Sequence, residues 1–154
     1  MTVTVGTDSY IDESELIAYA ALRGVTITTP DASIALIKAM DYLESQDFIG
    51  WKTEAAQPLQ WPRQGVYIDG VLVDSATVPQ EVKDAQAVIA MSINDGYDPL
   101  ATYGPAVKRR KTDVLETEYK DSASTTKYSP NITRALSKIV TSTSAGSIQL
   151  STYR

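Results

Sequence analysis

The chain has 154 residues, enough for one domain that buries its own core, and its formal net charge is −5. It contains no cysteine and no histidine, which excludes disulfides, thiolate nucleophiles, Ser-His-Asp triads and imidazole metal sites. We therefore expect a protein that is not an enzyme and that has neither a metal site nor a cofactor. No apolar run approaches the ~20 residues of a membrane span, and no secretion leader is visible. From these absences we expect that the protein has no membrane partner and that it is synthesised in a cytoplasm.

The charge is divided unevenly along the chain. Residues 1–107 carry five Lys or Arg against fifteen Asp or Glu, a net −10, whereas residues 108–154 carry nine against four, a net +5. An acidic body followed by a basic segment can pair head-to-tail with copies of itself, or present the basic segment to an acidic partner. An ordinary domain with a slightly basic end would show the same distribution, so charge alone leaves both interpretations open.

The first predicted helix begins after Asp12. Asp12 is a suitable N-cap, and Glu15 stands three residues later, where it completes a capping box. The helix is expected to run to about Arg23, with Gly24 as the residue that ends it. Capping explains the acidic run at residues 12–15 without a cation, because its spacing matches no metal-binding loop.

The second predicted helix opens at Thr29, with Pro30 at the first helical position and Asp31 in the first turn, and continues to about Gln46. Apolar residues occupy much of its length, which favours the central position in a small bundle. These apolar residues are Ile34, Leu36, Ile37, Met40 and Leu43.

Two tryptophans follow the second helix. Phe48, Ile49 and Trp51 stand where this helix should stop, and we expect them to plug the core; the alternative is a platform for a ligand. Trp61 precedes Pro62, which favours an extended backbone and orients the indole. Its ring is expected to pin a hairpin onto the helices; the alternative is a surface on which a nucleic-acid base stacks.

A β-hairpin is predicted over residues 66–73, because Asp69-Gly70 joins two β-branched runs and suits a type I′ turn. Pro79 then opens a third helix at its first position, and the helix runs to about Asn94. The residues expected to hold this central region together are Trp51, Trp61, Pro62, Arg63, Asp69, Gly70 and Pro79.

Residues 107–119 alternate in a way that is typical of one strand or two short strands with a solvated face. The basic run at 108–111 could bind phosphates. Acidic residues on the same face fit pairing with a neighbouring subunit better. The positions expected at subunit contacts are Val107, Lys108, Arg109, Arg110, Lys111, Val114, Glu116, Glu118 and Tyr119.

The last part of the sequence contains one short predicted helix, with Ser129 as its cap and Pro130 at its first position. The alternating pattern of residues 147–154 is typical of a strand, and we expect this terminal strand to be held by addition to another chain. The residues expected to reach that partner are Ile148, Leu150, Tyr153 and Arg154. The whole chain is thus expected to be mainly α (α+β): a core of three main helices and an inserted hairpin over residues 1–105, then extended β arms and a short helix over residues 106–154.

Several motifs resemble a group of tailed-bacteriophage proteins over nearly the whole chain. They are Val5-Gly6-Thr7-Asp8-Ser9-Tyr10, Trp51-Lys52, Leu59-Gln60-Trp61-Pro62-Arg63 with Gly65, Asp69-Gly70, Val78-Pro79 and Val82-Lys83-Asp84-Ala85, followed by the strand ending at Tyr119, the helix around Leu136 and the terminal strand closing on Arg154. Members of this group look like head–tail connector (adaptor) proteins. Some relatives are labelled DnaT-like single-stranded-DNA-binding proteins.

The connector resemblance implies a structural virion protein of the neck, assembled in the host bacterial cytoplasm. Such proteins form a twelve-fold homo-oligomeric ring between the portal protein and the stopper or tail-terminator protein, and DNA passes through the lumen only as cargo. An acidic body is compatible with that passage. The alternative is a replication accessory protein that binds single-stranded DNA through residues 108–111 together with Trp61.

Overall fold

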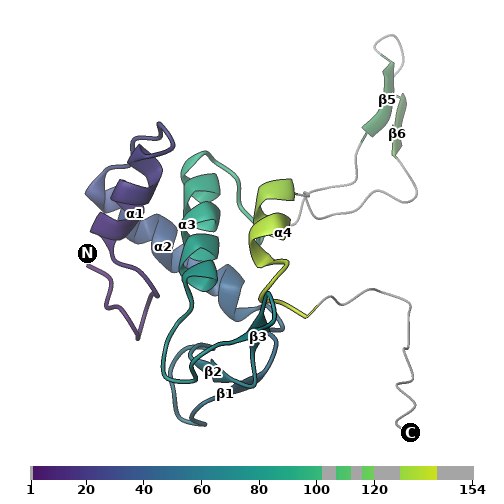
Figure 1. Ribbon diagram of the computed structural model, residues 1–154. Coiled ribbons are helices and arrows are strands. Elements are labelled where there is room, and N and C mark those ends of the chain that lie inside the picture. Colours follow the sequence, from purple (N-terminus) through teal and green to yellow (C-terminus); the bar gives the residue numbers. More distant parts are fainter. Residues whose placement is uncertain (1, 102–106, 112–115, 120–128, 142–154) are drawn as a thin grey trace, which may run out of the picture.

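A computed structural model of the chain describes residues 2–101, 107–111, 116–119 and 129–141. Within these ranges the protein is a mixed α+β fold built from helices and small antiparallel strand pairs (Figure 1). The helices are α1 (Glu13–Ala21), α2 (Thr29–Glu44), α3 (Gln80–Asn94) and α4 (Pro130–Leu136). The strands are β1 (Trp51–Lys52), β2 (Arg63–Gln64), β3 (Tyr67–Ile68), β4 (Val71–Leu72), β5 (Val107–Lys111) and β6 (Glu116–Tyr119). The expected combination of a helical bundle with an inserted hairpin is confirmed.

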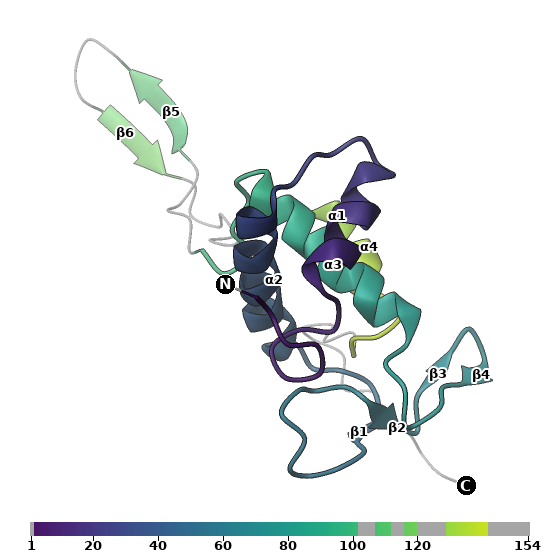
Figure 2. The ribbon, with the colours of Figure 1, turned by 90° about the vertical axis from the view of Figure 1, so that its left-hand side faces the viewer.

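Helix α3 is the centre of the bundle, because it packs against α1, α2 and α4. Figures 1 and 2 show α3 passing between the other helices. The prediction that the second helix would be central is therefore wrong. Small residues on α3, Ala85 and Ala90, are fully buried and allow the neighbouring helices to approach closely.

The helix starts follow local capping chemistry. Asp12 Oδ1 accepts a hydrogen bond from Glu15 N at 2.8 Å, and Glu15 Oε2 accepts one from Asp12 N at 3.0 Å, so the predicted capping box is confirmed. Two boundaries differ from expectation by one residue. Thr28, not Thr29, is the N-cap of α2, and Pro79 is the N-cap of α3 rather than its first helical residue.

The β1–β2 pair and the β3–β4 pair lie together at one end of the bundle, as both Figure 1 and Figure 2 show. In the β3–β4 hairpin, Asp69 (φ 50°) and Gly70 (φ 83°) both have the positive φ that a type I′ turn requires. The β1–β2 pair, in which Trp51 lies opposite Gln64, was not predicted.

The residues that directly follow α4 in the sequence hold it to the same end of the bundle through backbone hydrogen bonds. Ile49 N donates to Ile139 O at 3.1 Å, and Thr141 N donates to Asp47 O at 2.7 Å. Lys138 Nζ also lies 2.5 Å from Asp69 Oδ2 at the tip of the β3–β4 hairpin. The short helix is therefore an integral part of the body, and its Ile132 and Leu136 are buried there.

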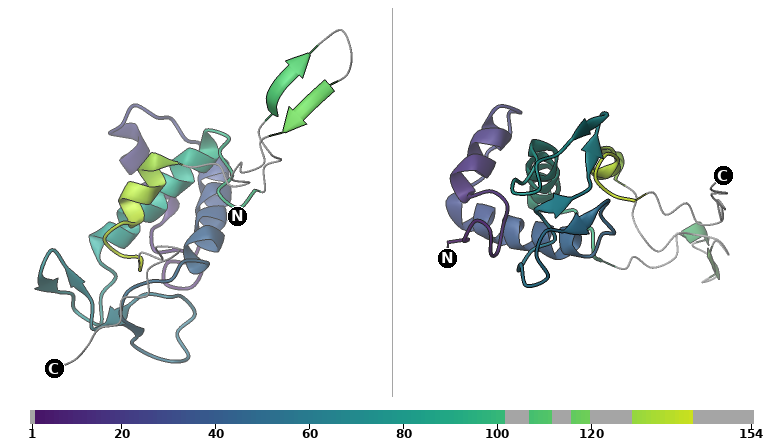
Figure 3. Two further views of the ribbon diagram at one scale, coloured as in Figure 1. Left: turned by 90° about the vertical axis from the view of Figure 1, so that its right-hand side faces the viewer. Right: turned by 60° about the horizontal axis from the view of Figure 1, so that its bottom comes forward.

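Strands β5 and β6 form an antiparallel hairpin that contacts none of the other described elements. Figure 3 shows this hairpin standing apart from the helices. Its register places position 109 opposite 118, 110 opposite 117 and 111 opposite 116. The predicted extended segment is thus two short strands. Residues 142–154, expected to form a terminal arm, lie outside the described residues.

Candidate nucleic-acid interface

Trp61, the residue considered for base stacking, lies inside the core with only 2 % of its surface exposed. Its ring meets Phe48 edge to face, with centroids 5.9 Å apart and an interplanar angle of 78°. The bond between Trp61 and Pro62 is cis. A base cannot reach this ring without unpacking the core, so the stacking interpretation of Trp61 is wrong and the packing interpretation describes its environment.

The backbone around Trp61 is held by a buried polar network. The Tyr10 hydroxyl group accepts a hydrogen bond from Trp61 N at 3.1 Å and donates one to Glu44 Oε1 at 3.0 Å. The same carboxylate oxygen accepts a hydrogen bond from Gln60 N at 3.0 Å. Burial, reinforced by the charge of Glu44, raises the pKa of Tyr10 above its ordinary value. The hydroxyl group therefore stays protonated and serves as a structural donor.

Arg63 is buried and its guanidinium group binds carbonyl oxygens of the protein itself. Nε donates to Ile49 O at 2.8 Å, and Nη2 donates to Gly50 O at 2.6 Å and to Phe48 O at 3.3 Å. Nη1 donates to Gln60 Oε1 at 2.9 Å. Burial lowers the pKa of Arg63 from its ordinary value, although the group remains charged. With its donors engaged in this way, Arg63 organises the loop before β1 and is not available to a phosphate.

Trp51 is the tryptophan that faces solvent. It exposes 70 % of its surface, so the expected core plug holds for Phe48 but is wrong for Trp51. Tyr67, at the start of β3, is also exposed. For Trp51 the disfavoured alternative of a ligand platform is therefore the one that its exposure leaves open. The periodicity of the sequence gives no signal that distinguishes this exposed ring from the buried ring of Trp61.

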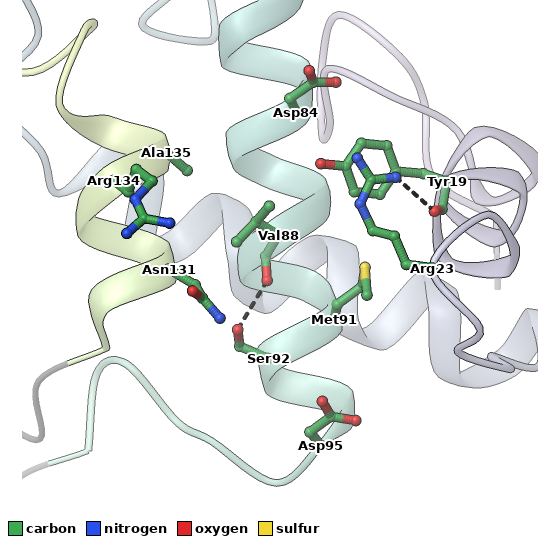
Figure 4. A pocket seen from close by; sticks show the side chains of 10 residues that line it. All are labelled: Tyr19, Arg23, Asp84, Val88, Met91, Ser92, Asp95, Asn131, Arg134 and Ala135. Atoms are coloured by element: carbon green, nitrogen blue, oxygen red, sulfur yellow. Dashed lines mark hydrogen bonds between the residues drawn. The ribbon is translucent and has the colours of Figure 1, made fainter.

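A groove of about 570 Å³ lies between α1 and α4 over the surface of α3 (Figure 4). It contains two arginines, Arg23 and Arg134, and two acids, Asp84 and Asp95. Arg23 is already engaged, because Nη1 donates to Tyr19 O at 2.9 Å and its guanidinium carbon lies 3.4 Å from the centroid of the Tyr19 ring. Equal numbers of opposite charges give the groove no preference for a polyanion.

The described helical body is acidic. Its residues 2–101 and 129–141 carry seven Lys or Arg against fifteen Asp or Glu, a net −8. Four consecutive basic residues stand instead at 108–111, almost the whole of β5. The described residues contain no acidic cluster able to hold a metal ion. A helix long and apolar enough to cross a membrane is also not found among them.

The predicted contact residues are distributed over two regions. Positions 107–111, 116, 118 and 119 come together in the β5–β6 hairpin, and each of the basic positions 109 and 111 lies opposite an acidic one in the register. Val114 and the four residues expected to reach a portal, Ile148, Leu150, Tyr153 and Arg154, lie outside the described residues. The hairpin and Trp51 are therefore the two features that can be weighed as a binding site.

The fold and these features define a small mixed α+β protein with an acidic body and a basic hairpin. A family model described as "Putative DnaT-like ssDNA binding protein" matches residues 2–154, so the chain belongs to that family. The chain matches no curated protein and no solved structure. None of these comparisons supports the resemblance to head–tail connectors, which stays a prediction.

Proposed function

We propose that the protein binds single-stranded DNA. The observation that carries this proposal is the family match over residues 2–154, whose description names single-stranded-DNA binding. The basic run at 108–111 supplies the chemistry, because Lys and Arg that neutralise phosphates release counterions and so provide most of the sequence-independent affinity. We expect no catalytic activity.

The charge distribution favours β5 as the phosphate contact. The helical body carries a net −8 and therefore supplies little attraction for a DNA backbone, and Arg63, although basic, is engaged internally. Within the hairpin, positions 109 and 111 lie opposite glutamates, whereas position 110 lies opposite a threonine. Because only part of the basic charge is unopposed in the register, we expect moderate affinity that falls steeply as salt is added.

The test is the affinity of the full chain for a fluorescent oligothymidylate as a function of salt. Each phosphate neutralised on a single strand contributes a slope of about −0.7 in log affinity against log salt concentration. Replacing Lys108 and Arg110 by Ser should reduce the magnitude of this slope by roughly one to two phosphate equivalents. Replacing Lys38 and Lys83 on the body by Ser removes the same charge and should leave the slope unchanged. No binding of the unaltered protein at low salt would overturn the proposal.

A second candidate function is a head–tail connector of a tailed bacteriophage. Two observations favour it: the acidic body, which would let DNA pass without holding it, and the basic β5–β6 hairpin, which contacts no other described element. Under this proposal the protein forms a homo-oligomeric, twelve-fold ring in the neck of the virion. The hairpin, residues 107–119, contacts the neighbouring subunit; Ile148, Leu150, Tyr153 and Arg154 contact the portal protein, and the opposite side receives the stopper or tail terminator.

Native mass determination of the protein, alone and mixed with its candidate portal ring, distinguishes the two functions. Addition of one copy per portal subunit supports the connector. A protein that ignores the portal but changes mass with a short single-stranded oligonucleotide supports the DNA-binding function. Deleting residues 145–154 should abolish portal attachment of a connector while leaving the described body folded, so unchanged attachment would contradict that candidate.

A further inference from the structure

Trp51 is presented to solvent on a support made by Gly65, the residue that directly follows β2. A methyl group placed on Gly65 would lie 2.5 Å from Trp51 Cζ3 and 2.9 Å from Cε3, closer than carbon atoms can approach. The six-membered ring of the indole therefore packs directly against the Gly65 backbone. The rest of the side chain is open, since 70 % of the residue surface is exposed.

The support is rigid because several contacts determine its shape. Trp51 pairs with Gln64 across the β1–β2 ladder. Gly50 has φ 72°, and a methyl group there would lie 2.5 Å from Gln64 O, so the two strands come together at a pair of glycines. Arg63 binds the carbonyl oxygens of residues 48, 49 and 50, which immediately precede Trp51. The ring is thus placed before any ligand arrives.

We propose that Trp51 is a stacking platform for an unpaired base of single-stranded DNA, an inference that rests on the proposed DNA-binding function. Every nucleobase has an aromatic face, so stacking on an indole is tolerant of sequence, as the function requires. A pre-placed ring loses little conformational entropy on binding.

The environment of Trp51 favours a base over a protein partner. Tryptophans that anchor protein interfaces insert into pockets and are ringed by contacts that exclude water. Trp51 has one side of its ring on Gly65, and its partner across the β1–β2 ladder is the polar Gln64 rather than an apolar residue. Trp61 cannot contribute to stacking because it is 2 % exposed.

Intrinsic fluorescence reports on this contact selectively, since the protein has two tryptophans and one of them is buried. Oligothymidylate added to the full chain at low salt should quench emission from Trp51. Trp51→Ala should abolish the quenching and weaken binding roughly 5- to 150-fold, the effect of losing about 1–3 kcal/mol of stacking from one base. Trp51→Phe should restore part of the affinity. Tyr67→Ala, which removes another exposed aromatic residue, is the matched control and should bind as the unaltered protein does.

The outcomes separate this inference from the function on which it rests. Binding that depends on residues 108–111 but is unchanged in Trp51→Ala overturns the stacking platform and leaves DNA binding intact. Failure of the unaltered protein to bind oligothymidylate at low salt overturns both. If Trp51→Ala instead disrupts association between copies or with a portal ring while oligonucleotide affinity stays constant, the surface is a protein interface and the proposal is wrong. Because Trp51 is exposed, each variant should retain the thermal unfolding transition of the parent, which must be checked first.

Discussion

The side chain of Gln86 on α3 binds the backbone of Tyr10, 76 positions earlier in the chain: Gln86 Oε1 accepts a hydrogen bond from Tyr10 N at 3.0 Å. The amide nitrogen of Gln86 donates to Ser9 Oγ at 2.7 Å and approaches Leu36 O at 3.4 Å. All of these groups are buried. One uncharged side chain in the central helix thus provides partners for the backbone of Tyr10 and the hydroxyl group of Ser9 in the segment that precedes α1.

Replacing Gln86 by Leu keeps the volume and removes these hydrogen bonds. The buried N–H of Tyr10 would then have lost its partner, and an unsatisfied buried donor costs more than the bond itself contributed. We expect the free energy of unfolding to fall by about 2–4 kcal/mol, measured by urea denaturation. Gln80→Leu, an exposed position on the same helix, is the control and should change stability by less than about 0.5 kcal/mol. Equal effects of the two substitutions would contradict the role of Gln86.

Arg63→Lys tests whether the fork of the guanidinium group is needed in the loop before β1. A lysine ammonium cannot reach three consecutive carbonyl oxygens and Gln60 at once, because it presents a compact charge on a single stem. We expect a loss of about 2–4 kcal/mol in the free energy of unfolding. In a Trp51→Phe background, where Trp61 is the remaining tryptophan, increased quenching of its fluorescence by acrylamide should accompany this loss. Lys38→Met removes an exposed charge as a control, and a comparable loss there would point to a general charge effect instead.

Gly65→Ala and Gly24→Ala separate backbone strain from contact with Trp51. The two glycines have nearly the same φ, 71° and 73°, but a methyl group at Gly24 meets nothing within 4 Å. Gly24→Ala should therefore cost only the left-handed backbone penalty of about 1–2 kcal/mol. Gly65→Ala should cost a further 1–3 kcal/mol or so, because the Trp51 ring must move. Equal losses in thermal or urea unfolding would show that the ring does not rest on Gly65.

Glu13 predicts a specific pH dependence of stability. Its Oε1 accepts hydrogen bonds from Val3 N at 2.9 Å and Ser33 Oγ at 2.8 Å, and the bond from Val3 N is the main cause that holds the pKa of this carboxyl below its ordinary value of 4.5. A carboxyl with a lowered folded pKa contributes stability above its unfolded pKa, and this contribution is lost as pH falls through the folded value.

Glu13→Gln should therefore be less stable than the parent at neutral pH, and the difference should shrink as pH falls below about 4.5. Melting temperatures of the two proteins measured across this range check the sign. Glu54→Gln, at an exposed loop position, should follow the parent at every pH. A difference that grows on acidification would contradict the assignment.

Local signals predicted most of the fold. The Asp12 capping box and the Asp69-Gly70 turn are decided by residues within a few positions of one another, so their chemistry is legible in the sequence. The prediction that α2 would be the central helix was wrong because it was based on the number of apolar residues in that helix. Burial at the centre of this bundle depends instead on small residues such as Ala85 and Ala90, which let three helices approach α3.

The candidate site was less accessible to sequence reasoning. The basic run at 108–111 is visible directly, because consecutive charges need no structure to be recognised. The contrast between Trp51 and Trp61 depends on the β1–β2 pair, which joins positions 11 and 13 residues apart and is held by Arg63 and two glycines. Neither the composition nor the periodicity of the sequence shows which of the two indole rings is exposed to solvent when β1 and β2 pair.

The closure of the body by α4 has a consequence for biosynthesis. Residues 139–141 pair with the segment 47–49, and Ile132, Leu136 and Ile139 fill the core. A nascent chain therefore cannot complete this core until residue 141 has left the ribosome, and the face of α3 that packs against α4 stays uncovered until then. Chaperones that bind apolar segments thus have a long interval in which to act, and ribosome-bound chains ending before α4 should be far more sensitive to protease than the released protein.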